Sequence, residues 1–216
     1  MSIYSLKPRF QALLRPLVGG LFRAGVTANQ VTLAACIVSV ALGVMLTIMP
    51  ERPALFLLVP LWLFLRMAFN AIDGVLAREF GQASKLGAYL NELTDVVSDA
   101  ALYLPFAFVP GSSPSLIAAI IALAIVSEYA GVLGATVGAS RRYDGPMGKS
   151  DRAFVFGLAG LLIGLHLDLA AVFTWLWAIV IGLLVLTIAN RVRSGLAEAR
   201  SGRPPGGEHT LAPGIT

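Results

Sequence analysis

Residues Val31–Met49 read VTLAACIVSVALGVMLTIM, an apolar run without a charged side chain. A helix of this length is long enough to cross the hydrocarbon core of a bilayer, because a spanning helix needs roughly 20 apolar residues. The composition of the chain agrees: 57% of its 216 residues are hydrophobic and 13% are charged. Soluble domains carry about 25% charged residues, so the composition argues against a water-soluble globule.

Five further apolar runs follow the first one. They occupy Ala54–Asn70, Leu86–Val109, Ser115–Gly138, Ala153–Leu165 and Leu169–Ala189. Long apolar runs favour helices, because the strands of a membrane barrel show short alternating patterns instead. The fifth run is short for a span, and its helix has room to begin earlier, near Met147. We therefore predict an all-α, polytopic membrane protein with six transmembrane helices, in a single domain over residues 1–193.

The basic residues decide between six spans and five. With six spans, 14 of the 16 Lys and Arg residues fall on one side, only Arg52 falls on the other, and Arg66 lies within a span. Basic loops stay cytosolic because their translocation is disfavoured. We therefore expect a multi-pass protein of the cytoplasmic (inner) membrane with both termini in the cytosol. The net charge of +4 then reflects topology and anionic headgroups rather than nucleic acid.

The two ends of the chain have their own patterns. Apolar residues recur at three- and four-residue steps among basic residues within 1–25. This pattern favours a helix lying in the membrane interface, although an amphipathic helix packed against the protein has the same pattern. Residues 194–216 are rich in Gly, Pro and Ser without periodicity, which predicts a disordered cytosolic tail.

Polar residues lie at membrane depth in the second and third runs, on one helical face in each case. Those near the cytosolic end of the second run are Arg66, Asn70 and Asp73, and those of the third run are Asn91, Asp95 and Asp99, with Glu92 beside them. A carboxylate at the bilayer centre costs roughly 2.5–3.5 kcal/mol, so this cluster requires compensation. Glu128 in the fourth run has no partner that the sequence identifies.

A bound divalent cation removes the repulsion among these carboxylates. Carboxylate and amide oxygens favour a hard ion, Mg²⁺ or Mn²⁺, over zinc. Because Cys36 is the single cysteine, a cysteine zinc cluster is excluded. The alternative is a proton relay or a helix-packing cluster that Arg66 and hydrogen bonds neutralise.

The segment that joins the two polar faces resembles a known signature. It runs from Asn70 to Asp95 and contains Asp73-Gly74, Ala77-Arg78, eight residues, then Gly87, Asn91 and Asp95 at four-residue steps. This spacing resembles the pattern of the CDP-alcohol phosphatidyltransferase family, D-x-x-D-G-x-x-A-R, eight residues, G-x-x-x-D-x-x-x-D. Asn70 and Asn91 stand where the family has its first and third aspartates. An asparagine offers a carbonyl oxygen but no charge, and it cannot act as a base.

The resemblance implies transfer of a phosphatidyl group from a CDP-linked lipid, such as CDP-diacylglycerol, to the hydroxyl of a polar alcohol, with release of CMP, in phospholipid synthesis. It also implies a metal-dependent enzyme that forms a homodimer. The asparagine pair keeps open a non-catalytic lipid-nucleotide binding or membrane-interaction protein with the same fold. The buried carboxylates alone suggest a third class, a proton- or cation-coupled transporter.

The resemblance assigns roles to particular residues. The metal ligands are Asp73, Asp95, Asn70 and Asn91, and Asp95 is also the catalytic general base. Asp99 lies outside the motif, but it is one helical turn beyond Asp95 on the same face, so we add it to the predicted metal ligands. The nucleotide-binding residues are Asp73, Gly74, Ala77, Arg78, Asn29 and Thr32. The acceptor-phosphate ligands are Lys149, Arg152 and Arg142.

Several of the predicted nucleotide and acceptor-phosphate residues also have a simpler explanation. Arg78 is equally typical of a basic anchor at the cytosolic end of a span, and Asn29 of a helix cap. Lys149 and Arg152 have the composition of a loop that contacts anionic headgroups.

Overall fold

The computed structural model describes residues 6–201, with side chains from residue 13 onward. The described residues form α-helices and short 3-10 helices, without a strand. The α-helices are α1 (Leu6–Arg23), α2 (Ala28–Ile48), α3 (Leu58–Glu79), α4 (Lys85–Tyr103), α5 (Pro114–Leu133), α6 (Lys149–Gly164) and α7 (Ala170–Arg200), and the 3-10 helices are η2 (Pro53–Leu57), η3 (Leu104–Phe108) and η4 (Gly134–Val137). The predicted all-α fold is confirmed.

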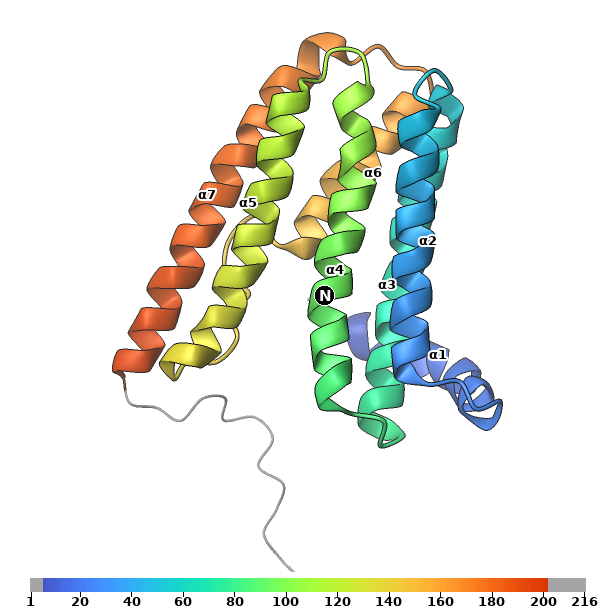
Figure 1. Ribbon diagram of the computed structural model, residues 1–216, viewed down its shortest axis with the longest axis vertical. Helices are drawn as coiled ribbons and strands as arrows, with labels where there is room; N and C mark the ends of the chain where they lie inside the picture. The colour runs from blue at the N-terminus through green and yellow to red at the C-terminus, as the bar shows by residue number, and fades with distance from the viewer. Residues whose placement is uncertain (1–5, 202–216) are drawn as a thin grey trace, which may run out of the picture.

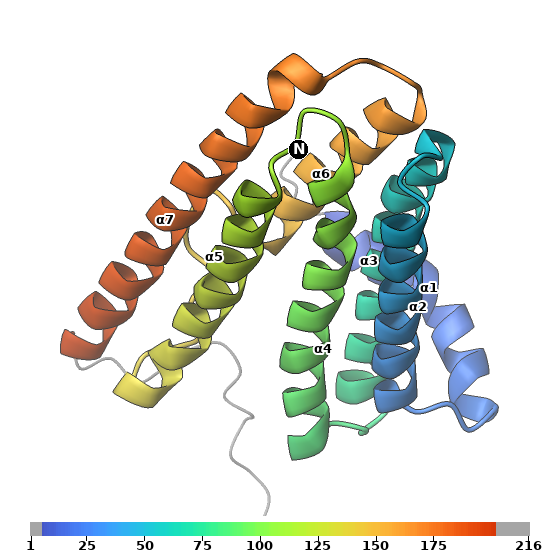
Figure 2. The same ribbon diagram turned by 45° about the horizontal axis from the view of Figure 1, so that its top comes forward.

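Six helices, α2 to α7, form an elongated bundle in which consecutive helices run in opposite directions (Figure 1). Helix α2 packs against both α3 and α4, whereas α5 packs against α7 on the other side of the bundle (Figure 2). Helix α6 packs against α3 and η2. Helix α1 lies across the end of the bundle where α2 begins and contacts α3.

All six predicted apolar runs are helical. Four helical segments are long and apolar enough to cross a membrane: Ala28–Ile48, Pro53–Glu79, Pro114–Val137 and Ala170–Arg200. Helix α4 carries the polar residues of the third run, and α6 has only 16 residues, which is about 24 Å of helix. That length falls short of a hydrocarbon core of about 30 Å.

Helix α6 is short because it begins in the middle of the bundle. The segment after η4 runs back along α5 before α6 starts (Figure 1). Gly145 has a φ of 117° and lies against Thr187 of α7, a conformation and a closeness that favour glycine. The Met147 amide donates to the Thr187 hydroxyl at 2.9 Å. These contacts fix the start of α6, at Lys149, part of the way along the bundle rather than at its end (Figure 1).

A column of aromatic rings fills the core between α4, α6 and α7. Tyr103 stacks on Phe156 with ring centroids 3.8 Å apart, and Phe156 stacks on Trp177 at 5.1 Å. Phe173 stacks on the other side of Trp177 at 5.4 Å. Aromatic pairs at these separations add to the stabilisation that burial alone provides, so the column joins the two halves of the bundle.

The two chain ends differ in how they match the sequence predictions. Helix α1 buries Val18 against Val75 and Leu76 of α3, while Leu13 is exposed. Its position in a membrane interface stays a prediction. The prediction of a tail from residue 194 is wrong up to residue 200, because α7 continues to Arg200. Glu198 secures this last part by accepting hydrogen bonds from the Ser140 amide and hydroxyl. Residues 202–216 lie outside the described part of the chain.

Substitution of Gly43 tests the close packing of α2 on α4. A Cβ at this position would lie 2.2 Å from the backbone oxygen of Ala101, so the helices must separate to admit alanine. We expect Gly43→Ala to lower the thermal midpoint of the purified protein in detergent, since overpacking costs roughly 1–3 kcal/mol.

Gly182→Ala is the matched control, because nothing lies within 4 Å of a Cβ at Gly182 in α7. This variant should unfold at the wild-type temperature or slightly above it, since alanine favours helix over glycine. An unchanged midpoint for Gly43→Ala would contradict the packing described here.

Candidate active site

A polar pocket of about 380 Å³ opens at the end of the bundle where α2 and α4 begin and α3 ends. Its walls include most of the predicted metal and nucleotide residues. They are Asn29, Thr32, Asn70, Asp73, Gly74, Ala77, Arg78 and Asn91, and the motif glycine Gly87 lies beside them. The structure therefore brings together three helices whose polar residues are up to about 60 positions apart in the chain.

The start of α2 fixes one wall of this pocket. Thr27 caps the helix, and its hydroxyl accepts from the Gln30 amide at 3.2 Å. The Ala28 amide donates to the Gln82 side chain at 2.6 Å. The Thr32 hydroxyl donates to Asp73 at 2.8 Å, which orients this buried carboxylate. Because Thr27 is the cap, Asn29 is left for the pocket.

Two glycines make room for pocket side chains. A Cβ at Gly87 would lie 2.9 Å from Oδ1 of Asn29, and a Cβ at Gly74 would lie 2.9 Å from Nη2 of Arg78. Both distances are shorter than ordinary van der Waals contact. The glycines of the motif therefore let Asn29 and Arg78 lie along the helix surfaces that form the pocket.

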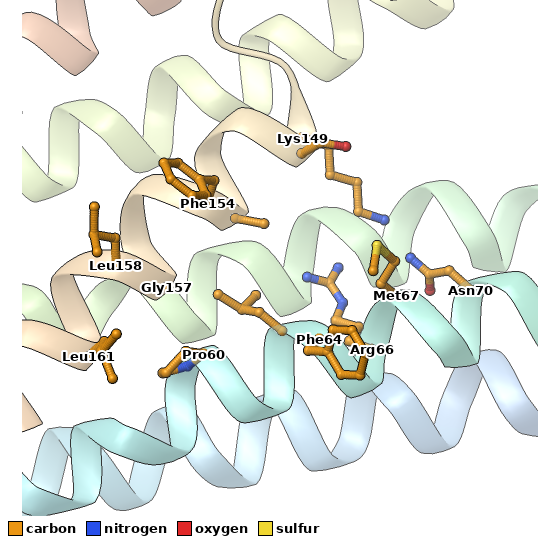
Figure 3. A pocket seen from close by; sticks show the side chains of 13 residues that line it. Pro60, Phe64, Arg66, Met67, Asn70, Lys149, Phe154, Gly157, Leu158 and Leu161 are labelled. Carbon is orange, nitrogen blue, oxygen red and sulfur yellow. The ribbon is translucent and has the colours of Figure 1, made fainter. Parts of the chain in front are cut away.

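A second cavity of about 510 Å³ lies between α3 and α6. Most of its lining is apolar, with Phe64 and Met67 from α3 facing Phe154 and Leu158 from α6 (Figure 3). Lys149, Arg66 and Asn70 lie at one end (Figure 3). We call this second cavity the apolar groove. Because Asn70 lines both the groove and the polar pocket, the two meet at this residue.

Arg66 holds the two aspartates of α4. Its Nη1 is 2.5 Å from Oδ1 of Asp99 and its Nη2 is 3.0 Å from Oδ1 of Asp95. Only 5% of the Arg66 side chain is exposed. Lys149 forms an ion pair with the second oxygen of Asp95. Asp95 thus carries a cation on each oxygen.

A larger ionic network continues behind Asp99. Nη2 of Arg152 is 3.1 Å from Oδ2 of Asp99 and 2.9 Å from Oε1 of Glu128. Glu128 also pairs with Arg191 at 3.4 Å and with Arg141 at 3.5 Å. Three arginines therefore surround one glutamate inside the bundle.

The predicted acceptor-phosphate residues are placed differently from one another. Lys149 and Arg152 both belong to the network around Asp95 and Asp99. Arg142 instead binds Asp144 through two hydrogen bonds, of 2.8 and 3.0 Å, and pairs with Glu198. The hydrogen bonds from Arg142 lower the pKa of the Asp144 carboxyl. The three residues do not form one cluster in the described structure.

The sequence did not identify the partners of Glu128. Arg141, Arg152 and Arg191 come from the segment before α6, from α6 and from α7. The one available signal was the presence of a carboxylate in an otherwise apolar helix, which requires cations nearby. Which arginines supply them depends on how the helices pack.

The side chains that could bind a metal ion in the pocket carry little negative charge. The described residues contain no group of three or more His, Cys, Asp or Glu side chains placed to hold a metal. Asp73, Asn70 and Asn91 line the pocket with hard oxygens, and Asp95 lies one helical turn beyond Asn91. These oxygens fit one hard divalent cation. The two asparagines bring two fewer negative charges than carboxylates there would bring.

This chain is similar to a known family and to several known proteins. The sequence profile described as CDP-alcohol phosphatidyltransferase matches residues 25–189. The inner membrane protein YnbA of Escherichia coli (strain K12) is 48% identical over 196 residues, which cover 91% of this chain and 97% of that protein. The phosphatidylinositol phosphate synthase of Mycobacteroides abscessus is 29% identical over 200 residues, covering 90% and 88% of the two chains.

Solved structures share the fold. The crystal structure of Mycobacterium tuberculosis phosphatidylinositol phosphate synthase with manganese and citrate superposes with a TM-score of 0.70 at 20% identity, covering 91% of this chain and 92% of that one. The same enzyme with CDP-DAG bound gives a TM-score of 0.68 at 22% identity, with coverage of 91% and 97%.

Replacement of Arg66 tests the buried network. Arg66→Met leaves Asp95 and Asp99 without this partner, and removal of one member of a buried ion pair costs roughly 3–5 kcal/mol. We expect a much lower thermal midpoint in detergent. Arg15→Met is the control, because the pair between Arg15 and Glu79 at 3.1 Å is exposed and is worth at most about 1 kcal/mol. Equal shifts for the two variants would refute a structural role of Arg66.

Proposed function

The chain belongs to the CDP-alcohol phosphatidyltransferase family, and we propose that its catalytic centre is the junction of the polar pocket and the apolar groove. The enzyme transfers a phosphatidyl group from a CDP-linked lipid to the hydroxyl of a polar alcohol and releases CMP. The phosphatidylinositol phosphate synthase relatives support this reaction class. In the reaction, the acceptor oxygen bonds to the lipid-side phosphorus. The bond from that phosphorus to the bridging oxygen breaks, and CMP leaves with that oxygen.

The shared wall at Asn70 is the observation that carries this proposal. A liponucleotide has a polar diphosphate and nucleoside joined to apolar acyl chains, so its site must offer both environments side by side. The pocket of about 380 Å³ suits the polar part, and the groove of about 510 Å³ between α3 and α6 suits an acyl chain. Apolar lining with a few placed polar groups is typical of ligand sites.

Within the pocket, the cytidine diphosphate binds the predicted nucleotide residues. Arg78 has no ion-pair partner within residues 6–201, so its guanidinium is available to a phosphate. Asn29 and Thr32 supply hydrogen-bonding groups from α2, although Thr32 also orients Asp73. Gly74 has no side chain and Ala77 has a small one, so the surface of α3 leaves room for the ligand at these positions.

Mg²⁺ or Mn²⁺ binds Asp73 and Asp95 together with the amide oxygens of Asn70 and Asn91. When bound, the ion supplies positive charge at the diphosphate oxygens and favours departure of CMP. Asp99 is not part of this proposed metal set, because its two oxygens pair with the buried arginines Arg66 and Arg152. One oxygen of Asp95 pairs instead with Lys149, whose side chain is 33% exposed and can move away.

Asp95 accepts the proton of the acceptor hydroxyl. Arg66 keeps the carboxylate oriented, because it also donates to the backbone oxygen of Asp95 at 3.2 Å. Lys149 must move away from its oxygen of Asp95 before that oxygen can take a proton. The Lys149 side chain is 33% exposed and flexible, so such a movement is feasible for it and not for buried Arg66.

The membrane arrangement extends the four candidate spans to six. Helices α4 and α6 lie alongside the other helices of the bundle, α6 at a tilt to α4 (Figure 2), and their polar residues are neutralised inside it. The bias of basic residues supports cytosolic termini and a catalytic centre open to the cytosol. The inner membrane relative agrees with this location. Homodimer formation stays a prediction, which chemical cross-linking in membranes checks.

Release of CMP tests the proposed reaction. Purified protein with CDP-diacylglycerol, Mn²⁺ and a panel of polar alcohols should release CMP. Asp73→Asn should reduce the rate at least about 100-fold, because electrostatic stabilisation at a reaction centre is worth that much.

The control for this experiment is the thermal midpoint of Asp73→Asn, which should stay close to wild type, since asparagine keeps the shape of the side chain. Absence of CMP release with every alcohol, together with tight liponucleotide binding, would instead identify a non-catalytic binding protein.

A restored motif aspartate tests the metal site. Asn91→Asp adds a carboxylate beside Asp73 and Asp95, and the number of charged ligands tunes divalent-ion affinity. We expect Mn²⁺ to bind about tenfold more tightly, as measured by the electron paramagnetic resonance signal of free Mn²⁺. Asn190→Asp is the control, because Asn190 belongs to α7 and does not line the pocket. The same gain in both variants would rule out a site at Asn91.

A further inference from the structure

We propose that Glu128 makes this enzyme select an acceptor alcohol that carries no phosphate group. The inference rests on the proposed function, since it names the acceptor class for that reaction. It follows from the arginine cluster, defined as Arg141, Arg152 and Arg191, and from the glutamate at its centre.

Each arginine of the cluster already has an anionic partner. Arg152 lies between Glu128 at 2.9 Å and Asp99 at 3.1 Å. Arg191 pairs with Glu128 at 3.4 Å and also donates to the backbone oxygens of Ser127 and Asp144. Arg141 is shared between Glu128 and Glu92. A phosphate entering the cluster would have to displace a carboxylate.

Burial makes such a displacement costly. The side chain of Arg152 is 1% exposed and that of Glu128 is 13% exposed. A carboxylate that lost its arginine to a phosphate would be left as an unpaired charge inside the bundle. An unpaired buried charge is far less stable than a paired one. Glu128 therefore acts as a built-in anion that excludes an external one.

The space around Arg152 agrees with this conclusion. A cavity of about 10 Å³ is lined by Asp99, Tyr103, Glu128 and Arg152. Such a volume holds about one water molecule. The Tyr103 hydroxyl and Nε of Arg152 are buried without a protein partner in the described structure, and a water there would satisfy them. A phosphate group does not fit.

Lys149 does not replace the cluster as a phosphate ligand. It pairs with Asp95 and lines the apolar groove, as Asn70 does. When Lys149 moves away from Asp95, an acceptor phosphate bound to it would place a second negative charge near the acceptor oxygen, which itself becomes negative as Asp95 takes its proton, and the two charges would repel. Hydroxyl groups, which donate and accept hydrogen bonds without charge, suit this position.

Paired acceptors test the inference. Purified full-length protein with CDP-diacylglycerol and Mn²⁺ is given glycerol or glycerol 3-phosphate, and inositol or inositol phosphate. We expect the unphosphorylated member of an accepted pair to give a kcat/KM at least about tenfold higher. Preference for the phosphorylated member, with normal CMP release, would overturn the inference and leave the proposed function intact.

A lack of turnover with every acceptor would count against the proposed function. A binding measurement tests the inference in that case as well. Calorimetric titration of the wild-type protein with glycerol 3-phosphate should show no binding at millimolar concentration. Binding by the wild-type protein would overturn the role of Glu128.

Glu128→Gln is the decisive variant, because it removes the charge and keeps the shape. We expect binding of glycerol 3-phosphate to appear, and its use relative to glycerol to rise at least about tenfold. Glu51→Gln, at an exposed position in the turn after α2, is the control and should leave the ratio unchanged.

Glu92→Gln provides a second variant in case Glu128→Gln does not fold. The Glu92 side chain is 32% exposed and pairs with Arg141, so the fold should tolerate its replacement. A smaller rise in the same ratio is expected. Folded variants with the wild-type acceptor ratio and no binding of glycerol 3-phosphate would refute the inference.

Discussion

The pairing of Arg66 with Asp95 and Asp99 is the interaction on which the rest of the structure depends. Two carboxylates on α4 lie within an apolar bundle, where an isolated charge is expensive. Arg66 on α3 reaches both, with N to O distances of 3.0 and 2.5 Å. The pair fixes the position of α3 relative to α4 and with it the walls of the polar pocket. The proposed catalytic centre is therefore built on an interaction that also stabilises the fold.

Buried charges are also paired with opposite charges in the rest of the bundle, as far as α7. Arg152 links Asp99 to Glu128, and Glu128 in turn neutralises Arg191. The two asparagines at motif positions reduce the negative charge of the pocket, and Glu128 reduces the positive charge behind it. The first effect acts on the pocket and the second on the region behind it, and each brings its own region closer to neutral.

The shape of the site matches the amphiphilic character of a liponucleotide. The polar pocket lies at the end of the bundle, and the apolar groove runs along α3 and α6 from Lys149 (Figure 3). Helix α6 creates this arrangement because it begins inside the bundle, where Gly145 and Met147 rest on Thr187. A longer α6 that began at the end of the bundle would carry Lys149 away from Asp95.

The sequence by itself determined the helical runs, the family and the walls of the pocket, because apolar length and helical spacing are local properties of the chain. It also placed Asn70 and Asp73 on one face, as the structure shows. Only the tertiary structure decided which cations neutralise which carboxylates, since Glu128 meets arginines from three separate segments. It also decided that α7 continues past residue 194, because Glu198 binds Ser140 far away in the chain. Ion pairs between helices depend on packing, and local sequence does not specify packing.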